Sequence, residues 1–424
     1  MLIAVIVALA LLALLNRRSA NSFLYPPALF AGVWSIYLFL LWWAGKLFYQ
    51  IAEDTLFFYF CGALTFSAGG LCCSLFARPL QNNLCLTSPA TSPGRRKALR
   101  RVLDVLLILL LLALPWYWRH IVQVAAQAGI SDLWAAIRVQ MIVEGTENTG
   151  AFRLMDNLVV LALILALLIY YEDDGTRTCR LRTYIAAALA FVYTLTTATR
   201  SSGVALALYL LALHWFKRGR ITRNAAVSFL LVFVLIFSGL GILVRKGEAR
   251  PEASLTENVP ALVDGLLWYS LGGIVAFDTV LHEPTRVSPT QSVFRPILVA
   301  GSKLGLKRNV PQLHAEYVPI GPGKDMNIYT MYFSYVPEFG VAGTMLVMFV
   351  LGAAITAVYW WARRGSTIAT LMFSVLFAGI VLSAFAENLV STMNFTAKLL
   401  IFTWVLNARA GRHTASRPSP IDRC

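Results

Sequence analysis

The sequence predicts an all-α polytopic membrane protein with about 11 transmembrane helices and one large outer loop that carries amphipathic helices. Hydrophobic residues make up 58% of the 424-residue chain and charged residues 13%, and the mean hydropathy is +0.67. Soluble domains of this length do not have such a composition. The apolar runs are interrupted once by a long polar segment that bears aromatic residues, Arg245 to Glu338. A loop of this size on one face is where chemistry or recognition is concentrated.

Each predicted span is a mostly apolar run close to the ~20 residues that a membrane crossing needs. The candidates are Leu2–Leu15, Ala28–Ala44, Leu56–Phe76, Val102–Trp118, Asp156–Tyr171, Thr183–Ala198, Gly203–Phe216, Ala225–Val244, Phe339–Trp361, Ile368–Phe385 and Leu389–Asn407. The first run is short, and no small-residue cleavage site with a polar mature sequence follows it. We therefore interpret it as a retained span and not as a removed signal peptide.

The basic residues predict how the chain is oriented in the membrane. They fall on alternate connections, at Arg17–Arg18, Arg95–Lys97 with Arg100–Arg101, Arg177 to Arg182, Lys217 to Arg223, Arg363–Arg364 and the C-terminal tail. The positive-inside rule makes that side cytoplasmic, so we expect the N-terminus outside and the C-terminus in the cytoplasm. The net charge of +15 is then mainly an orientation signal. It does not indicate a nucleic-acid partner, because no soluble domain gathers the basic residues on one face.

This topology divides the chain into four parts: spans one to eight (residues 1–244), the large outer loop (245–338), spans nine to eleven (339–408) and a basic tail (409–424). Pro260–Leu281 is nearly apolar enough to span and change this count, but Asp264 and Asp278 would be costly in lipid. We expect a helix there that lies at the outer membrane surface or packs against the bundle. Ile130–Val143 has apolar residues at helical spacing, which predicts an interfacial amphipathic helix.

Four arginines on the outer side are candidates for binding a diphosphate. Arg200 stands alone between the sixth and seventh spans, in the sequence TRSSG, where a helix is expected to start. A guanidinium beside the free N–H groups of a helix N-terminus suits a diphosphate, and the positive-inside rule disfavours arginine on this side. Arg245 follows the eighth span, Arg153 precedes the fifth, and Arg295 lies in a basic stretch of the loop. The alternative for each is an arginine that reaches lipid headgroups.

The segment Gly321–Thr330 (GPGKDMNIYT) carries the sharpest local signal. Gly-Pro-Gly makes a turn, and Asn327 or the aspartate two positions before it is expected to cap a helix that continues into the ninth span. Asn327, Tyr329 and Thr330 would then share the first helical turn at the membrane surface, with Tyr332 just beyond them. Amide groups and aromatic faces in this setting bind sugars. The alternative is a belt of aromatic residues at the interface.

His314 and Glu338 are the candidates for a general base. A histidine can accept a proton near neutral pH, although a lone loop histidine is more often structural. Glu338 and Glu387 lie at the outer ends of predicted spans, where a carboxylate is either a base or an ordinary interface residue. The sequence has no cluster of His and Cys at metal-ligand spacing, so we predict no metal.

Two short motifs resemble a known family. The stretch Asn327–Met345 (NIYTMYFSYVPEFGVAGTM) resembles the N-x-Y-T … Y … D-F-G … G pattern of bacterial O-antigen polymerases of the Wzy type, which join oligosaccharide repeat units. It departs from that pattern at Glu338, where the family more usually has aspartate. Arg200 in TRSSG resembles the arginine that those proteins carry between two spans on the periplasmic side. Many spans, one large periplasmic loop near the C-terminal third and a basic cytoplasmic tail are similar as well.

The resemblance implies a GT-C-like glycosyltransferase of the bacterial inner membrane, with a periplasmic N-terminus. The donor would be a growing glycan on undecaprenyl diphosphate, and the acceptor would be the lipid-linked repeat unit. No cofactor, nucleotide sugar or bound metal is implied, so cations and N–H dipoles must stabilise the leaving diphosphate. The implied partners are this lipid-linked oligosaccharide, the phospholipid membrane and a chain-length regulator protein.

The expected roles follow from this reaction. The diphosphate would be bound by Arg200, Arg245, Arg153 and Arg295. Arg200 would also act in catalysis, and His314 or Glu338 would deprotonate the acceptor hydroxyl. The residues expected to position sugars are Asn327, Tyr329, Thr330 and Tyr332.

Three other functions stay open at this point. An O-antigen ligase shares the donor and the plan but transfers the glycan to lipid A–core. A flippase or other transporter of lipid-linked oligosaccharides would need polar residues along a path through the membrane, and the predicted spans carry almost no charge apart from Lys398, Asp104 and Asp156. A non-catalytic member of a polysaccharide assembly complex would tolerate alanine at each arginine named above.

Overall fold

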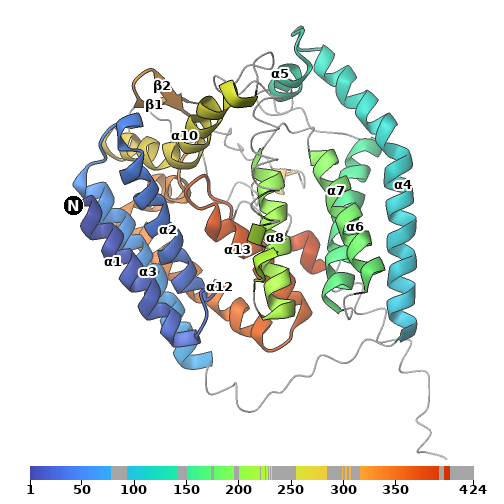
Figure 1. Ribbon diagram of the computed structural model, residues 1–424, viewed down its shortest axis with the longest axis horizontal. Coiled ribbons are helices and arrows are strands. Elements are labelled where there is room, and N and C mark those ends of the chain that lie inside the picture. Colours follow the sequence, from blue (N-terminus) through green and yellow to red (C-terminus); the bar gives the residue numbers. More distant parts are fainter. Residues whose placement is uncertain are drawn as a thin grey trace, which may run out of the picture. The chain divides into compact units, whose positions relative to one another are not determined.

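The computed structural model is mostly helical, with one small β-hairpin in the part of the chain that it describes (Figure 1). The described residues are 1–77, 93–140, 150–172, 176–194, 200–219, 221–224, 226–227, 229, 231, 255–283, 298, 301–302, 305–306, 316–390 and 396–401. The chain forms two compact units. Unit 1 contains Met1–Cys85, Leu231–Arg364 and Phe373–Met393, and unit 2 contains Leu86–Leu230, Gly365–Met372 and Asn394–Cys424.

Four described helices are long and apolar enough to cross a membrane. They are α1 (Leu2–Ala20), α2 (Pro26–Trp43), Glu53–Phe76 within α3 (Glu53–Ala77), and α12 (Val336–Arg363). Shorter apolar helices occur at Leu154–Tyr170, Gly203–Phe216 and Thr367–Val381. These helices fit a helical membrane protein, as the composition predicts, while the number of about 11 spans stays a prediction. The predicted runs Ala225–Val244 and Leu389–Asn407 lie largely outside the described residues.

In unit 1, α3 packs along α12, and α1 and α2 pack beside α3. Thr65 of α3 lies 3.7 Å from the sulfur of Met345. Further along the same pair, the indole N–H of Trp360 donates to the Ser74 hydroxyl at 2.9 Å. Residue numbers therefore rise together on the two helices, so α3 and α12 run parallel.

Glycines allow α3 and α12 to approach through their backbones. A Cβ atom on Gly69 would collide with the carbonyl oxygen of Phe349. In the same way, a Cβ atom on Gly352 would collide with the carbonyl oxygen of Phe66. The contact is reciprocal, with one glycine on each helix against the backbone of the other. Small residues at helix contacts are the usual means of close packing in a membrane, where lipid removes the hydrophobic driving force.

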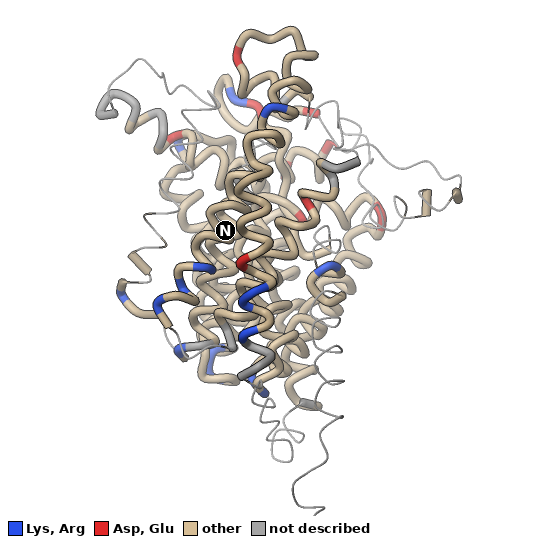
Figure 2. Tube along the Cα trace, turned by 90° about the vertical axis from the view of Figure 1, so that its right-hand side faces the viewer, with Lys and Arg blue, Asp and Glu red and all other residues tan. Residues whose placement is uncertain are grey.

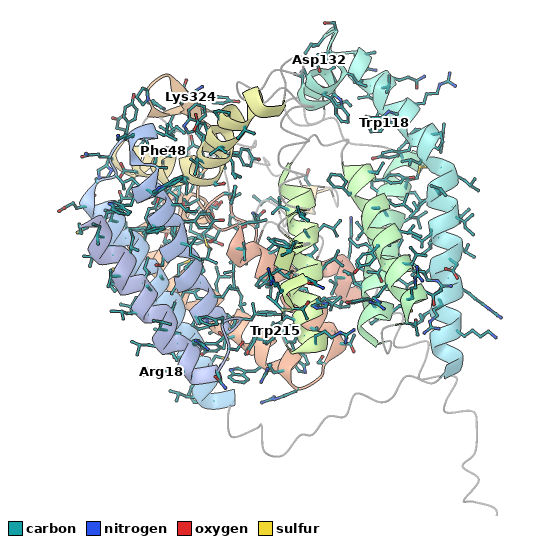
Figure 3. The ribbon with its side chains drawn as sticks, in the orientation of Figure 1. Arg18, Phe48, Trp118, Asp132, Trp215 and Lys324 are labelled. Carbon is teal, nitrogen blue, oxygen red and sulfur yellow. The ribbon has the colours of Figure 1, made fainter. Side chains whose placement is uncertain are left out.

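The two ends of unit 1 differ in charge. Basic residues lie where α1 and α12 finish, at Arg17, Arg18, Arg363 and Arg364. Figure 3 shows Arg18 at this end, and Phe48 and Lys324 at the opposite end, which we call the hairpin end. The helices of unit 2, which face the viewer in Figure 2, also differ in charge between their ends, with Lys and Arg mainly toward the lower ends and Asp and Glu mainly toward the upper ends. If the positive-inside rule holds, the hairpin end is the outer end.

The predicted helix at Pro260–Leu281 is confirmed. It is part of α10 (Leu255–His282), which packs against α2 and against the hairpin formed by β1 (Val318–Gly321) and β2 (Lys324–Met326). Of the two expected placements, the structure supports packing against the bundle.

Unit 2 contains α4 (Pro93–Ala126), α5 (Leu133–Arg138), α6 (Gly150–Glu172), α7 (Arg177–Thr194) and α8 (Arg200–Arg218). Two carboxylates within predicted spans have partners on neighbouring helices. Arg182 donates from Nε and Nη2 to the two oxygens of Asp104, at 2.6 and 2.8 Å. Tyr117 donates to Asp156 at 2.7 Å. These bonds join α4 to α7 and to α6.

The predicted amphipathic helix at Ile130–Val143 is present as the shorter α5. Asp132 caps it by accepting from the backbone N–H groups of Trp134 and Ala135, at 2.9 and 3.0 Å. Figure 3 shows Asp132 near the upper end of α4, where Trp118 also lies. The rings of Trp118 and Trp134 are 5.7 Å apart.

Candidate functional site

The predicted diphosphate-binding residues fall partly outside the described structure. Arg245 and Arg295, and with them the candidate base His314, lie beyond the described residues. Arg153 lies in the first turn of α6, and Arg200 is the first residue of α8. The Tyr170 hydroxyl at the far end of α6 is 3.3 Å from the ring of His214 near the far end of α8. This contact joins the C-terminal parts of α6 and α8, while Arg153 and Arg200 lie in the first turns of the same two helices.

The Gly-Pro-Gly turn is confirmed, but the helix expected after it is wrong. β1 and β2 pair in antiparallel register, with Val318 opposite Met326, and Gly323 adopts a φ of +65° in the turn. The hairpin is fixed by burial of its apolar side chains and by a backbone bond, in which Tyr49 N–H donates to the Ile320 carbonyl at 2.9 Å. Tertiary packing of these short strands outweighs the local preference for a capped helix.

Two glycines of α10 allow the segment that follows the hairpin to pack closely against this helix. A Cβ atom on Gly272 would lie 2.6 Å from the Met326 side chain, and one on Gly273 would lie 2.7 Å from the Ala384 carbonyl oxygen and 3.4 Å from that of Ile328. The next residues therefore lie in a close-packed junction between α10 and the turn that follows α13 (Thr367–Val381).

Asn327, Tyr329 and Thr330 do not share a helical turn, contrary to the prediction. The segment 327–330 has no regular secondary structure, a short 3-10 helix (η6, Met331–Ser334) follows, and α12 starts only at Val336. Tyr329 is 5% exposed and donates to the Glu316 carbonyl at 3.2 Å. Asn327 is half-buried, so its amide is the more accessible of these groups.

Tyr332 belongs to a buried aromatic cluster. It is 0% exposed, and its ring centroid lies 5.3 Å from that of Trp34, 5.2 Å from Phe58 and 5.7 Å from Tyr59. Its hydroxyl abuts Gly62 of α3. No face of this ring is open for a sugar to stack on, so we leave Tyr332 out of the sugar-contacting group.

Glu338 is exposed in the first turn of α12, directly before a kink in the backbone. Gly340 has φ 63° and ψ −176°, so the helical geometry is broken at this residue and resumes beyond it. The Thr344 hydroxyl donates to the Gly340 carbonyl at 2.7 Å. The Glu-Phe-Gly sequence thus turns the chain from the packed junction into the apolar helix and leaves the carboxylate of Glu338 at the surface.

We expect Gly340→Ala to destabilise the start of α12 by about 1–3 kcal/mol, because side chains other than glycine are strained in this backbone region. Thermal unfolding of the purified chain measures the effect. Gly45→Ala is the matched control, since a Cβ atom there meets nothing within 4 Å. Equal melting temperatures for the two variants would contradict the assignment of strain to position 340.

Tyr335 and Glu387 form a contact that sequence reasoning did not find. The Tyr335 hydroxyl donates to Glu387 Oε1 at 2.9 Å, and the same oxygen accepts from the N–H groups of Leu389 and Val390, both at 2.7 Å. Burial raises the pKa of Tyr335 well above its usual value, so the phenol stays a proton donor at physiological pH. Met331 N–H also donates to the Ser383 carbonyl at 2.8 Å. The turn after α13 is therefore fixed beside the start of α12.

The described residues bring part of the predicted site together. Asn327 and Glu338 both lie at the hairpin end of unit 1, on the segment that leads into α12, whereas Arg153 and Arg200 lie in unit 2. A comparison with known proteins finds no matching family model, no matching curated protein and no matching solved structure.

Proposed function

We propose that this chain polymerises lipid-linked oligosaccharide repeat units at the periplasmic face of a bacterial inner membrane. In the reaction, a hydroxyl oxygen of the acceptor repeat unit forms a bond to the anomeric carbon of the donor glycan. The bond from that carbon to the diphosphate oxygen breaks, and undecaprenyl diphosphate leaves with the bonding electrons. The hydroxyl proton passes to a base on the protein.

The proposal is supported above all by Asn327–Met345, the stretch that resembles the polymerase pattern. Its residues are packed at the hairpin end of unit 1, opposite the basic residues Arg17 and Arg18, and they lead through a kink into an apolar helix. A reaction on a lipid-linked sugar needs its polar groups at such a junction between an apolar helix and the aqueous face.

The roles we propose follow from the positions of the groups. Arg200, with the N–H groups at the start of α8, would stabilise charge on the leaving diphosphate, together with Arg153, Arg245 and Arg295. Glu338 or His314 would accept the hydroxyl proton. Asn327 would contact sugar directly, and the packed Tyr329 and Thr330 would hold it in position.

The transporter alternative is less favoured by the contacts in unit 2. Asp104 and Asp156 are the carboxylates that could have marked a polar path, and each is bonded to a neighbouring helix. A ligase remains the nearest enzyme alternative, because it would use the same donor and the same kind of diphosphate site.

The test is the banding of surface polysaccharide on a gel, from a strain that lacks this gene and from the same strain with the gene restored. We expect a band of single repeat units with the ladder lost, and a ladder again on restoration. Loss of all surface glycan with polymer held on the lipid carrier would instead mean a ligase. Loss of every periplasmic product would mean a flippase, and an unchanged ladder would exclude all three.

A further inference from the structure

His282 ends α10 and is held by groups from two elements of unit 1. Its Nδ1 lies 2.9 Å from the carbonyl oxygen of Asp278, one helical turn earlier, and 3.5 Å from the Asp278 carboxylate. Its Nε2 lies 2.9 and 3.1 Å from the two carboxylate oxygens of Asp54, in the first turn of α3. The histidine therefore links the end of α10 to the start of α3.

These contacts require a doubly protonated ring. A carbonyl oxygen and a carboxylate are both acceptors, so each ring nitrogen must carry a hydrogen for both bonds to exist. Neutral imidazole has only one N–H and would lose one of the two bonds. Hydrogen bonding to the Asp278 carbonyl, and then to the Asp54 carboxylate, raises the pKa of His282. The ring is 40% exposed, so protons reach it from solvent.

The negative charges of Asp278 and Asp54 also favour the imidazolium. Asp278 Oδ1 accepts from Ala52 N–H at 3.2 Å and from the Thr55 hydroxyl at 2.5 Å, which fixes this carboxylate against the start of α3. Glu53 beside it faces the amino group of Met1 at 3.7 Å. Among the described residues, no group of three or more His, Cys, Asp and Glu is arranged to hold a metal ion.

The helix α10 also packs against the segment that follows the hairpin. Gly272 and Gly273 of α10 pack against Met326 and against the backbone of Ile328. The helix that His282 ends is therefore in direct contact with this segment, at positions nine and ten residues before the histidine.

We propose that His282 is a proton-operated latch that ties α10 to the start of α3. Protonated, it bonds both Asp278 and Asp54 and holds α10 in place over residues 327–330. Loss of its proton leaves one N–H, so the ring keeps the bond to Asp278 or the bond to Asp54 but not both. The link from α10 to α3 is then weaker, although the Asp278 bonds to Ala52 and Thr55 remain. This latch does not depend on the glycosyl transfer proposed above.

The direction of the pH effect follows from the raised pKa. The latch is fully formed below the pKa of an unfolded histidine, about 6.5, and is lost as the pH rises through the higher pKa of the folded state. Hydrogen–deuterium exchange of the full chain in detergent micelles measures it, with rates corrected for intrinsic exchange. The pair is exposed to solvent, which limits its contribution. Between about pH 6 and pH 9 we therefore expect protection at the end of α10 to fall about two- to fivefold, with a smaller fall at residues 327–330.

Two variants and one control decide the proposal. His282→Gln cannot titrate, so the pH dependence at the end of α10 should vanish, and Asp54→Asn should weaken it in the same region. His120→Gln is the matched control, because His120 stacks on Phe152 in unit 2, with ring centroids 3.7 Å apart. If wild-type protection is the same at both pH values, or if His282→Gln keeps the wild-type dependence, the latch does not exist. Should His282→Gln fail to fold, the wild-type and Asp54→Asn profiles still give the answer.

Discussion

Replacing Gly352 by alanine is expected to prevent the normal packing of α3 on α12 and to leave little folded protein. The added Cβ atom would collide with the carbonyl oxygen of Phe66, which is backbone and cannot swing aside as a side chain does. Overpacking of this kind costs about 1–3 kcal/mol, and more where backbone must move. The measurement is the melting temperature of the purified chain, together with the fraction that elutes as a single peak in size-exclusion chromatography.

Gly265→Ala is the control for this experiment. Gly265 also lies in a helix, α10, but a Cβ atom there meets nothing within 4 Å. Alanine favours a helix over glycine by about 1 kcal/mol, so this variant should be neutral or slightly more stable. The same substitution is thus expected to have opposite signs at the two positions. A Gly352→Ala protein as stable as Gly265→Ala would mean that α3 and α12 do not approach through these glycines.

Arg200→Ala is expected to abolish the polysaccharide ladder and leave single repeat units. If Arg200 stabilises the leaving diphosphate, its loss removes a charged donor that acts where negative charge develops. Removal of one such donor lowers a rate by about 10²–10³-fold. The strain that lacks the gene, restored with the variant gene, is compared on a gel with the same strain restored with the wild-type gene. The amount of protein in the membrane is measured in parallel.

Arg218→Ala is the matched control, because Arg218 is the last residue of the same helix, α8. It removes the same charge from the opposite end, where no diphosphate role is proposed, and the ladder should persist. A full ladder in the Arg200→Ala strain would remove the central residue of the proposed mechanism. Loss of the ladder in both strains, with normal protein amounts, would show that the arginine effect is not specific to position 200.

The apolar helices were predictable from the sequence because a membrane leaves the backbone little choice. Lipid offers no hydrogen-bond partners, so a long apolar run must satisfy its N–H and C=O groups within itself. α1, α2 and α12 follow the predicted runs for this reason. The hairpin was not predictable in this way. Its strands of four and three residues are too short for a periodic signal, and their pairing depends on distant contacts with Tyr49 and Gly272.

The candidate site was predictable only where it depends on adjacent residues. Glu338 lies in the first turn of α12, near the predicted start of the ninth span, but the sequence did not reveal the kink at Gly340. The prediction that this end faces outward stays untested. The bond from Tyr335 to Glu387 joins residues 52 positions apart, and that from His282 to Asp54 joins residues 228 apart. Neither partner leaves a local pattern, because each bond exists only when separate helices come together.

The parallel pairing of α3 with α12 also constrains how the protein is made. The contact between Thr65 and Met345 spans 280 residues, and most of unit 2 lies between them in the chain. During synthesis, α3 therefore enters the membrane long before its partner exists, with its glycine face lacking α12. The helices of unit 2 between residues 86 and 230 can meet while translation continues, whereas the core of unit 1 closes only when α12 is inserted. Unit 1 is thus started first, but its α3–α12 core is complete only after the helices of unit 2 between residues 86 and 230 have been made. A chain that stops before α12 lacks the helix on which α3 packs.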